Sequence, residues 1–287
     1  MLIDKGETMR IRIGLAIALA CMLAGTAFAA SAKQGPPPAW TPVVSSCGAS
    51  TVTGSQGPVT GPGTPPAGVG SYRFAIGANG DTYRTLRSNY LAGTSLTGLT
   101  VLTYYTYVTS FGSGGQAPYI DLRVDLNGDG TPDDILTFEP IYQTGGYSGD
   151  AVPNQGAVAL NTWQSWNAVV GGWWSENAGN SGPPLVTLAH YAADHPGTRI
   201  TSIRLATGCG GAAWANFVGY LDKVTIGANG STRVFDFEPV AVKPKPQQKP
   251  RQEHKTALCH RGHTIRVDNH AVAAHLRHGD TLGPCHG

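Results

Sequence analysis

The chain has 287 residues, of which 41% are hydrophobic and 13% are charged, and its formal net charge is +2. The charge is unevenly distributed, because residues 33–240 carry nine Lys and Arg against thirteen Asp and Glu, whereas residues 241–287 carry eight against three. The acidic body argues against a nucleic-acid partner, and the basic tail predicts an affinity for anionic surfaces such as wall polymers.

Residues 1–30 have the features of a signal peptide. A positive start at Met9–Arg12 precedes an apolar stretch over residues 13–24, and the A-x-A pattern of a cleavage site follows at Ala27–Ala29. The alternative, a lipoprotein anchored through Cys21, is disfavoured by the poor lipobox before that cysteine. No other apolar run of this length follows, so we expect a secreted or periplasmic protein without a transmembrane anchor.

Composition divides the rest of the chain into four parts. Residues 31–71 are rich in Pro, Gly and Ser and predict an irregular extension. Residues 72–242 predict one domain, long enough to bury a single core. Residues 243–256 form a basic, Pro-rich linker, and residues 257–287 form a compact module rich in His and Cys.

Short runs of Val, Ile, Thr, Tyr and Phe alternate with Gly, Asn, Pro and Ser turns between residues 72 and 242. This pattern predicts a mainly β fold, a two-sheet antiparallel sandwich of jelly-roll type. The expected strands are Tyr72–Ile76, Thr82–Leu86, Leu99–Thr109, Tyr119–Leu126, Asp134–Tyr142, Gly156–Leu160, Thr198–Ala206, Gly219–Ile226 and Thr232–Glu238. One helix is expected at Leu185–Asp194, and the Asn-Gly pairs within Ile76–Tyr83 and Ile226–Arg233 predict hairpin turns.

The segment Asp125–Asp134 places oxygen-bearing side chains at relative positions 1, 3, 5 and 9, with Gly130 at position 6. Because Ca²⁺ takes about six to eight oxygen ligands, this spacing predicts a calcium loop. The flanking residues have strand patterns, so the loop would join two strands and not the helices of an EF-hand. The candidate ligands are Asp125, Asn127, Asp129, Thr131, Asp133 and Asp134. The alternative is an acidic hairpin that binds nothing.

Four cysteines remain after the signal peptide, and an even number in an exported protein predicts disulfides. Their distribution favours the pairs Cys47–Cys209 in the body and Cys259–Cys285 in the tail. A disulfide or a metal is needed to hold so small a module together. A zinc site formed by Cys259, His275, His278 and Cys285 is the alternative to the second disulfide.

Aromatic residues provide the candidate ligand-binding surface. Flat rings flanked by Asn, Gln and Ser suit sugars, whose C–H faces stack while their hydroxyls form hydrogen bonds. The candidates are Trp163, Trp166, Trp173, Trp174 and Tyr105. The alternative is that these tryptophans fill the core of the sandwich.

Enzyme signatures are weak. The sequence contains no H-E-x-x-H, G-x-S-x-G or P-loop motif. The carboxylates of Glu139, Glu176, Asp236 and Glu238 could pair as in a glycosidase, but the sequence places no two of them together. We therefore expect a protein that is not an enzyme.

Two stretches resemble known patterns. The tail, Cys259–Cys285, closely resembles a short element at the C-terminus of many exported bacterial proteins of unassigned function. The body resembles uncharacterised secreted bacterial proteins over Tyr119–Glu238, and Gly219–Ile226 is similar to the last strands of jelly-roll carbohydrate-binding modules. The latter resemblance implies a two-sheet sandwich, a structural calcium ion and a sugar partner.

The sequence thus predicts an exported, non-catalytic module that binds a polysaccharide or a cell-surface glycan through a calcium-stabilised sandwich. The alternative is a structural or adhesive envelope-associated protein that binds no sugar, with the basic tail docked on anionic polymers of the envelope.

Overall fold

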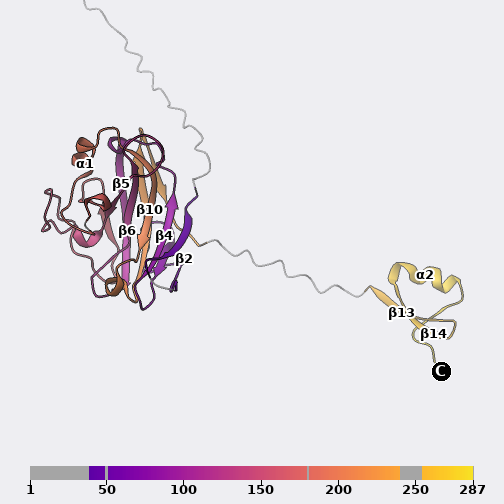
Figure 1. Ribbon diagram of the computed structural model, residues 1–287. Helices are drawn as coiled ribbons and strands as arrows, with labels where there is room; N and C mark the ends of the chain where they lie inside the picture. The colour runs from indigo at the N-terminus through magenta and orange to yellow at the C-terminus, as the bar shows by residue number, and fades with distance from the viewer. Residues whose placement is uncertain (1–38, 49–50, 180, 240–253, 287) are drawn as a thin grey trace, which may run out of the picture.

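The computed structural model describes residues 39–48, 51–179, 181–239 and 254–286. The predicted signal peptide and most of the predicted linker lie outside the described residues. Residues 39–239 form two six-stranded antiparallel sheets, here called sheet A and sheet B, and residues 254–286 form a separate three-stranded sheet with one helix (Figure 1). Among the described residues, no helix is long and apolar enough to cross a bilayer.

Sheet A has the strand order β1-β4-β10-β6-β7-β9. Its strands are β1 (Thr41–Ser46), β4 (Thr82–Ser88), β10 (Arg199–Thr207), β6 (Tyr119–Asp125), β7 (Asp134–Phe138) and β9 (Trp174–Ser175). The register places Asp121 of β6 between Arg204 of β10 and Thr137 of β7. These three side chains therefore share one face of the sheet.

Sheet B has the order β2-β3-β11-β5-β8. Its strands are β2 (Ser55–Thr60), β3 (Gly70–Ala75), β11 (Val218–Ala228), β5 (Leu99–Ser110) and β8 (Gln164–Asn167), and β12 (Ser231–Phe235) also pairs with β11. Strands β3 and β12 pair with successive halves of β11 on the same edge. The predicted mainly β, two-sheet sandwich is confirmed.

Apart from a smaller cluster around Trp214 and Phe217, alternation along the strands builds one main core between the sheets. Ile120, Leu122 and Val124 of β6 are fully buried there, whereas Asp121 and Arg123 point to the outer face. Large aromatic side chains from both sheets complete the same core, among them Phe74, Tyr104, Phe138, Trp166 and Trp173. The outer face of sheet A is thereby left to polar residues such as Asp121 and Arg123, together with Tyr119 and Ile135.

Short helices lie in the connections. They are η1 (Leu96–Gly98), η2 (Pro140–Tyr142), η3 (Glu176–Ala178), α1 (Leu188–Asp194) and η4 (Gly211–Trp214). The predicted helix begins three residues late, because Leu185 and Val186 form bridges to Gly149 and Trp173, and Thr187 then caps the helix by accepting from the His190 N–H. The strand expected to continue to Tyr142 ends at Phe138, because the short helix η2 begins two residues later at Pro140.

Several sequence expectations differ from the fold. Strands β1 and β2 lie in the segment expected to be irregular, and residues 156–160 contain no strand, only one bridge from Leu160 to Val108. The Asn229-Gly230 pair forms the expected β11–β12 hairpin, with both residues at positive φ. The prediction of a hairpin at Asn79-Gly80 is wrong, because that turn leads from β3 in sheet B to β4 in sheet A and the two strands do not pair.

The C-terminal module consists of β13 (Lys255–His260), β14 (His263–Asp268), α2 (Asn269–Arg277) and β15 (Thr281–Leu282), with sheet order β14-β13-β15. Asp268 caps α2 by accepting from the His270 N–H at 2.9 Å. Both predicted disulfides, Cys47–Cys209 and Cys259–Cys285, are present. In this module the disulfide supplements a core in which Leu258 is the only described hydrophobic side chain that is fully buried.

Candidate functional site

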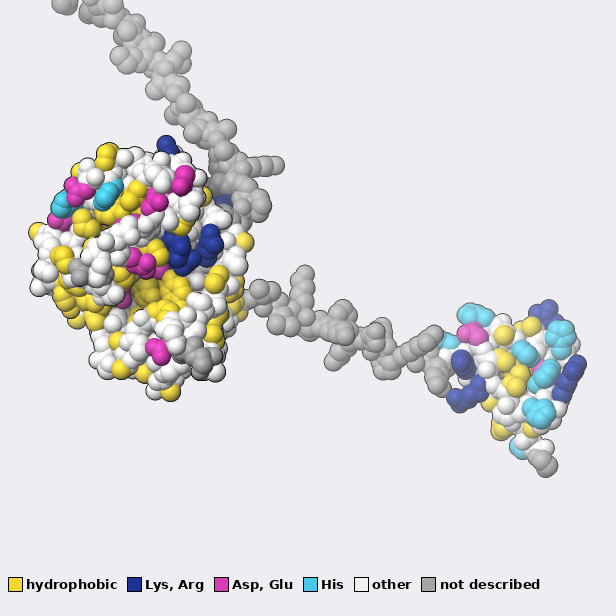
Figure 2. Space-filling model, viewed as in Figure 1, with side chains coloured by type: hydrophobic (Ala, Val, Ile, Leu, Met, Phe, Trp, Pro, Cys, Tyr) yellow, Lys and Arg dark blue, Asp and Glu magenta, His cyan; other side chains and the backbone are white. Residues whose placement is uncertain are grey.

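A groove of about 500 Å³ crosses the outer face of sheet A. Its floor comes from β4, β6, β7 and β10, because outward residues of neighbouring strands lie side by side. Tyr83, Asp121, Arg123 and Arg204 line it, and Glu139 and Trp174 close one side. Figure 2 shows acidic and basic side chains next to each other over β6 and β10 on this face.

Asp121 lies at the centre of the groove and is only 4% exposed. Its carboxylate accepts hydrogen bonds from the Tyr83 hydroxyl and from Thr137 Oγ1, the latter at 2.9 Å. Burial raises the pKa of Asp121, and these two hydrogen bonds together with the charge of Arg204 oppose the rise. A fixed acceptor beside a fixed cation is suited to hold a polyhydroxylated ligand.

Glu139 and Trp174 form a second polar pair in the groove. Strand β9 pairs with β7, and the Trp174 indole Nε1–H donates to Glu139 Oε2 at 3.0 Å. Burial raises the pKa of Glu139 to about 7, which exceeds the opposing effect of the indole hydrogen bond. Trp174 itself is half-buried, so part of its ring faces the groove.

Two buried polar atoms on the groove wall lack partners. Gln116 Oε1 and Arg123 Nε form no hydrogen bond among the described residues, and Gln116 is 8% exposed. A buried polar group without a partner costs about 1–3 kcal/mol. A polar ligand or an ordered water that reaches these atoms would remove that cost.

The structure distributes the predicted glycan-binding residues over three environments. Trp166 and Trp173 are 1% and 0% exposed in the core, so the prediction that they bind a sugar is wrong. Their indoles donate inward, to Thr106 Oγ1 and to the Ala168 carbonyl. The alternative, that tryptophans fill the core, is correct for these two.

Tyr105 lies on β5 of sheet B, and Trp163 directly precedes β8 and packs against the same sheet, so neither lines the groove. Trp163 packs on Tyr107 at 5.4 Å between ring centroids and donates to the Pro62 carbonyl. Tyr105 lies 5.6 Å from the Lys223 ammonium. Of the five predicted aromatic residues, only Trp174 lines the groove.

The sequence did not predict four residues of the groove, Tyr83, Asp121, Arg123 and Arg204. The available signal was the alternation of β6, in which Asp121 and Arg123 interrupt an otherwise apolar strand. The same alternation is typical of any solvated sheet face. Only the strand order β4-β10-β6 places the four side chains in one groove.

The β6–β7 loop holds the candidate calcium ligands. Asp125 is 3% exposed and accepts from the N–H groups of Asn127, Gly128 and Gly130. These backbone donors, that of Gly130 most strongly, lower its pKa. The side chains of Asn127, Asp129, Thr131 and Asp133 are exposed in the same loop.

Asp134 does not fit the predicted ligand set. Its Oδ2 accepts from Ser175 Oγ at 2.5 Å and from the Tyr191 hydroxyl at 2.7 Å, and its Oδ1 accepts from the Asn177 N–H at 3.1 Å. This carboxylate therefore joins β7 to η3 and α1 and has no free oxygen for the loop. A calcium ion in the loop would be held by the other five residues.

The predicted zinc site does not form, and the carboxylates that could pair as in a glycosidase do not all lie together. The prediction of a zinc site that contains Cys259 and Cys285 is wrong, because these two cysteines form a disulfide with each other. Glu139 and Glu176 line the groove. Glu238 instead accepts from the N–H groups of Val69 and Gly70. It therefore fixes the loop before β3.

The fold and the groove define a β-sandwich with a polar, aromatic-rimmed groove on one sheet. The chain matches no protein-family profile and no curated protein sequence. Solved structures similar to it include the family 11 carbohydrate-binding module of a cellulosomal cellulase of Clostridium thermocellum, at 9% identity and a TM-score of 0.37, covering 68% of this chain and 91% of that module.

A family 11 carbohydrate-binding module from Clostridium thermocellum in complex with a β-1,3-1,4-mixed-linked tetrasaccharide is similar at 11% identity and a TM-score of 0.36, covering 68% of this chain and 92% of that module. A third similar structure is SGBP-B from a complex xyloglucan utilization locus in Bacteroides uniformis. It has 12% identity and a TM-score of 0.29, covering 61% of this chain and 46% of that protein.

Proposed function

We propose that the groove of sheet A binds a glycan and that the protein is an exported, non-catalytic binding module. The observation that carries this proposal is a groove in which aromatic rings surround hydrogen-bonding groups, two of them without partners. Trp174 and Tyr83 offer ring surface for the C–H face of a sugar. Asp121, Arg123 and Gln116 offer an acceptor, donors and an amide for its hydroxyls.

Trp174→Ala is expected to weaken retention on a bound polysaccharide by at least about tenfold, because buried aromatic anchors carry much of the free energy of binding at such sites. The measurement is affinity electrophoresis of the full chain through gels containing a panel of soluble plant and bacterial polysaccharides. Trp163→Ala is the matched control, since Trp163 is also half-buried and its indole also donates a hydrogen bond, but it packs against sheet B, outside the groove.

The reverse result, loss of retention in Trp163→Ala alone, would place the glycan surface on sheet B. Absence of retention of the unaltered protein on every polysaccharide would contradict the proposal. It would favour the alternative, a structural or adhesive protein of the envelope. Export is supported by the two disulfides, which form in oxidising compartments. The affinity of the tail for anionic wall polymers stays a prediction.

We further propose that the β6–β7 loop binds Ca²⁺ and stabilises the hairpin. The support is the supply of hard oxygen donors, because Asp125 is held by three backbone N–H groups and the side chains of Asn127, Asp129 and Asp133 are exposed in the same loop. The ion would stiffen the turn between β6 and β7. It would lie outside the groove, so its contribution would be to stability.

Chelation with EGTA is expected to lower the melting temperature by about 5–10 °C. At a Ca²⁺ concentration of about 100 Kd, binding stabilises the folded state by about 2.7 kcal/mol, and about 1 kcal/mol corresponds to roughly 2–4 °C for a domain of this size. Differential scanning calorimetry of the full chain measures the shift. Asp129→Asn should abolish most of it while keeping the hydrogen bond to Thr131. Equal melting temperatures with Ca²⁺ and with EGTA would show an acidic hairpin that binds nothing.

A further inference from the structure

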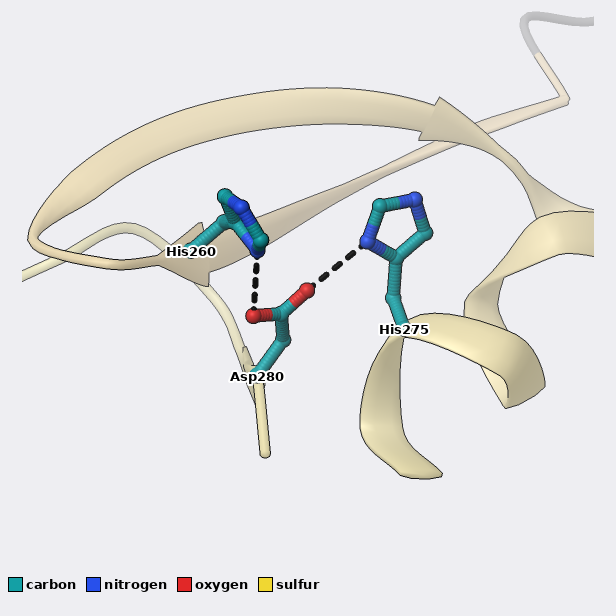
Figure 3. Close-up of side chains that lie close together, drawn as sticks. All are labelled: His260, His275 and Asp280. Atoms are coloured by element: carbon teal, nitrogen blue, oxygen red, sulfur yellow. Dashed lines mark hydrogen bonds and ion pairs between the residues drawn. The ribbon is translucent and has the colours of Figure 1, made fainter. Parts of the chain in front are cut away.

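Three side chains of the C-terminal module converge on one point (Figure 3). The Asp280 carboxylate accepts from His260 Nδ1 at 2.6 Å through one oxygen and from His275 Nδ1 at 2.7 Å through the other. The potential ligand atoms of the three residues all lie within 4.8 Å of one another. No other group of three His, Cys, Asp or Glu residues in the described part of the chain meets this condition.

The surrounding fold holds these residues in place. His260 ends β13 directly after Cys259, whose disulfide to Cys285 ties the two ends of the module together. His275 lies in the last turn of α2, and the Asp280 N–H donates to the His275 carbonyl at 3.2 Å. A strand end, a helix end and the loop before β15 are thus fixed around one carboxylate. Such preorganisation reduces the entropy lost when a ligand binds.

Exposure differs between the members of the cluster. The Asp280 side chain is 4% exposed, whereas those of His260 and His275 are 38% and 31% exposed. The carboxylate therefore forms the floor, and the imidazoles form an open rim. An ion bound here would have protein ligands on one side and solvent on the other.

We propose that His260, His275 and Asp280 form a binding site for a divalent transition-metal ion of the Zn²⁺ type. Two imidazole nitrogens and one carboxylate are the donors that such ions prefer, whereas Ca²⁺ and Mg²⁺ require mainly oxygen. Each imidazole would bind the ion through Nδ1 in its Nε2–H tautomer, so the Nδ1 proton that now points at Asp280 would pass to solvent while Nε2 takes one up. Three protein ligands would leave a coordination position toward solvent, open to water or to an anionic ligand.

This set differs from the zinc site predicted from sequence. It contains His275 but no cysteine, so it is compatible with the Cys259–Cys285 disulfide. His278 is replaced by Asp280, because the chain turns at Gly279, which has φ of 91°, and brings the carboxylate back beneath His275. The competing interpretation is that the carboxylate only joins the two imidazoles by hydrogen bonds.

The test is isothermal titration calorimetry of Zn²⁺ into the full chain, with excess Ca²⁺ present to occupy oxygen-rich loops. We expect one equivalent of tightly bound Zn²⁺, with affinity reduced at least about tenfold in Asp280→Asn and in His275→Gln. His270→Gln is the matched control, because His270 is exposed on the same helix α2 but outside the cluster, and it should bind as the unaltered protein does. Equal affinity in all variants, or no binding by the unaltered protein, would overturn the proposal.

A second measurement does not depend on any variant remaining folded. In NMR spectra of the unaltered full chain, substoichiometric Zn²⁺ should shift the ring signals of His260 and His275 before those of His263 and His270. Shifts that begin at His263 or His270, or that spread evenly over the histidines of the tail, would show nonspecific binding and overturn the proposal.

Discussion

Trp173→Ala is expected to lower the free energy of unfolding by about 3–5 kcal/mol. The Trp173 side chain is 0% exposed and packs against Phe138 at 5.5 Å between ring centroids. Its indole donates to the Ala168 carbonyl at 2.8 Å, so truncation leaves a cavity and also removes the shorter of the two hydrogen bonds to that buried carbonyl. Urea denaturation of the full chain, followed by tryptophan fluorescence, measures the loss.

Trp174→Ala provides the contrast for this prediction. The adjacent residue points to the opposite face of β9, where its half-buried ring faces the groove. Its truncation should cost clearly less stability than that of Trp173 but reduce glycan retention. If both variants were equally destabilised, Trp174 would belong to the core and the groove would lose its principal aromatic surface.

The second large effect is expected on removal of the Cys47–Cys209 disulfide by the double substitution Cys47→Ser and Cys209→Ser. The two cysteines are separated by 162 positions, so the cross-link closes a long loop in the unfolded chain. Such cross-links contribute about 2–4 kcal/mol. The loss should appear as a lower melting temperature in calorimetry.

The loss should also be visible locally in β1. All six residues of β1 are exposed, and β4 is its only strand neighbour in the described part of the chain. Without the disulfide, the backbone amides of β1 should exchange with solvent faster than those of β10. The pair Cys259→Ser and Cys285→Ser should leave the protection of β1 unchanged. Unchanged melting temperature and exchange in the first double variant would contradict an important role for this cross-link.

Features that depend on local pattern could be predicted from the sequence. The alternation of Ile120, Leu122 and Val124 identifies β6 and its buried face, and Asp268 marks the start of α2. The pairing of the four cysteines followed from their distribution along the chain. Strands β1 and β2 could not be predicted, because they are edge strands, held by pairing, with no fully buried residue to produce a pattern.

The groove could not be predicted for a different reason. Tyr83, Asp121 and Arg204 come from three strands far apart in the chain, and each alone is an ordinary polar residue on a solvated face. Strand parity does require that Trp173 and Trp174 face opposite sides. It does not indicate which side is the core, and only the pairing of β9 with β7 decides that.

The alternation in β6 also bears on how the chain avoids misassembly. A slip of β6 by one residue against β10 or β7 would turn Asp121 and Arg123 into the core and expose Leu122 and Val124. Burying two charges without matched partners is far costlier than any contact such a slip could form. The charged side chains of Asp121 and Arg123 therefore also disfavour a shifted register of β6 during folding. A substitution at either position can lower the folding yield even when the final native state is intact.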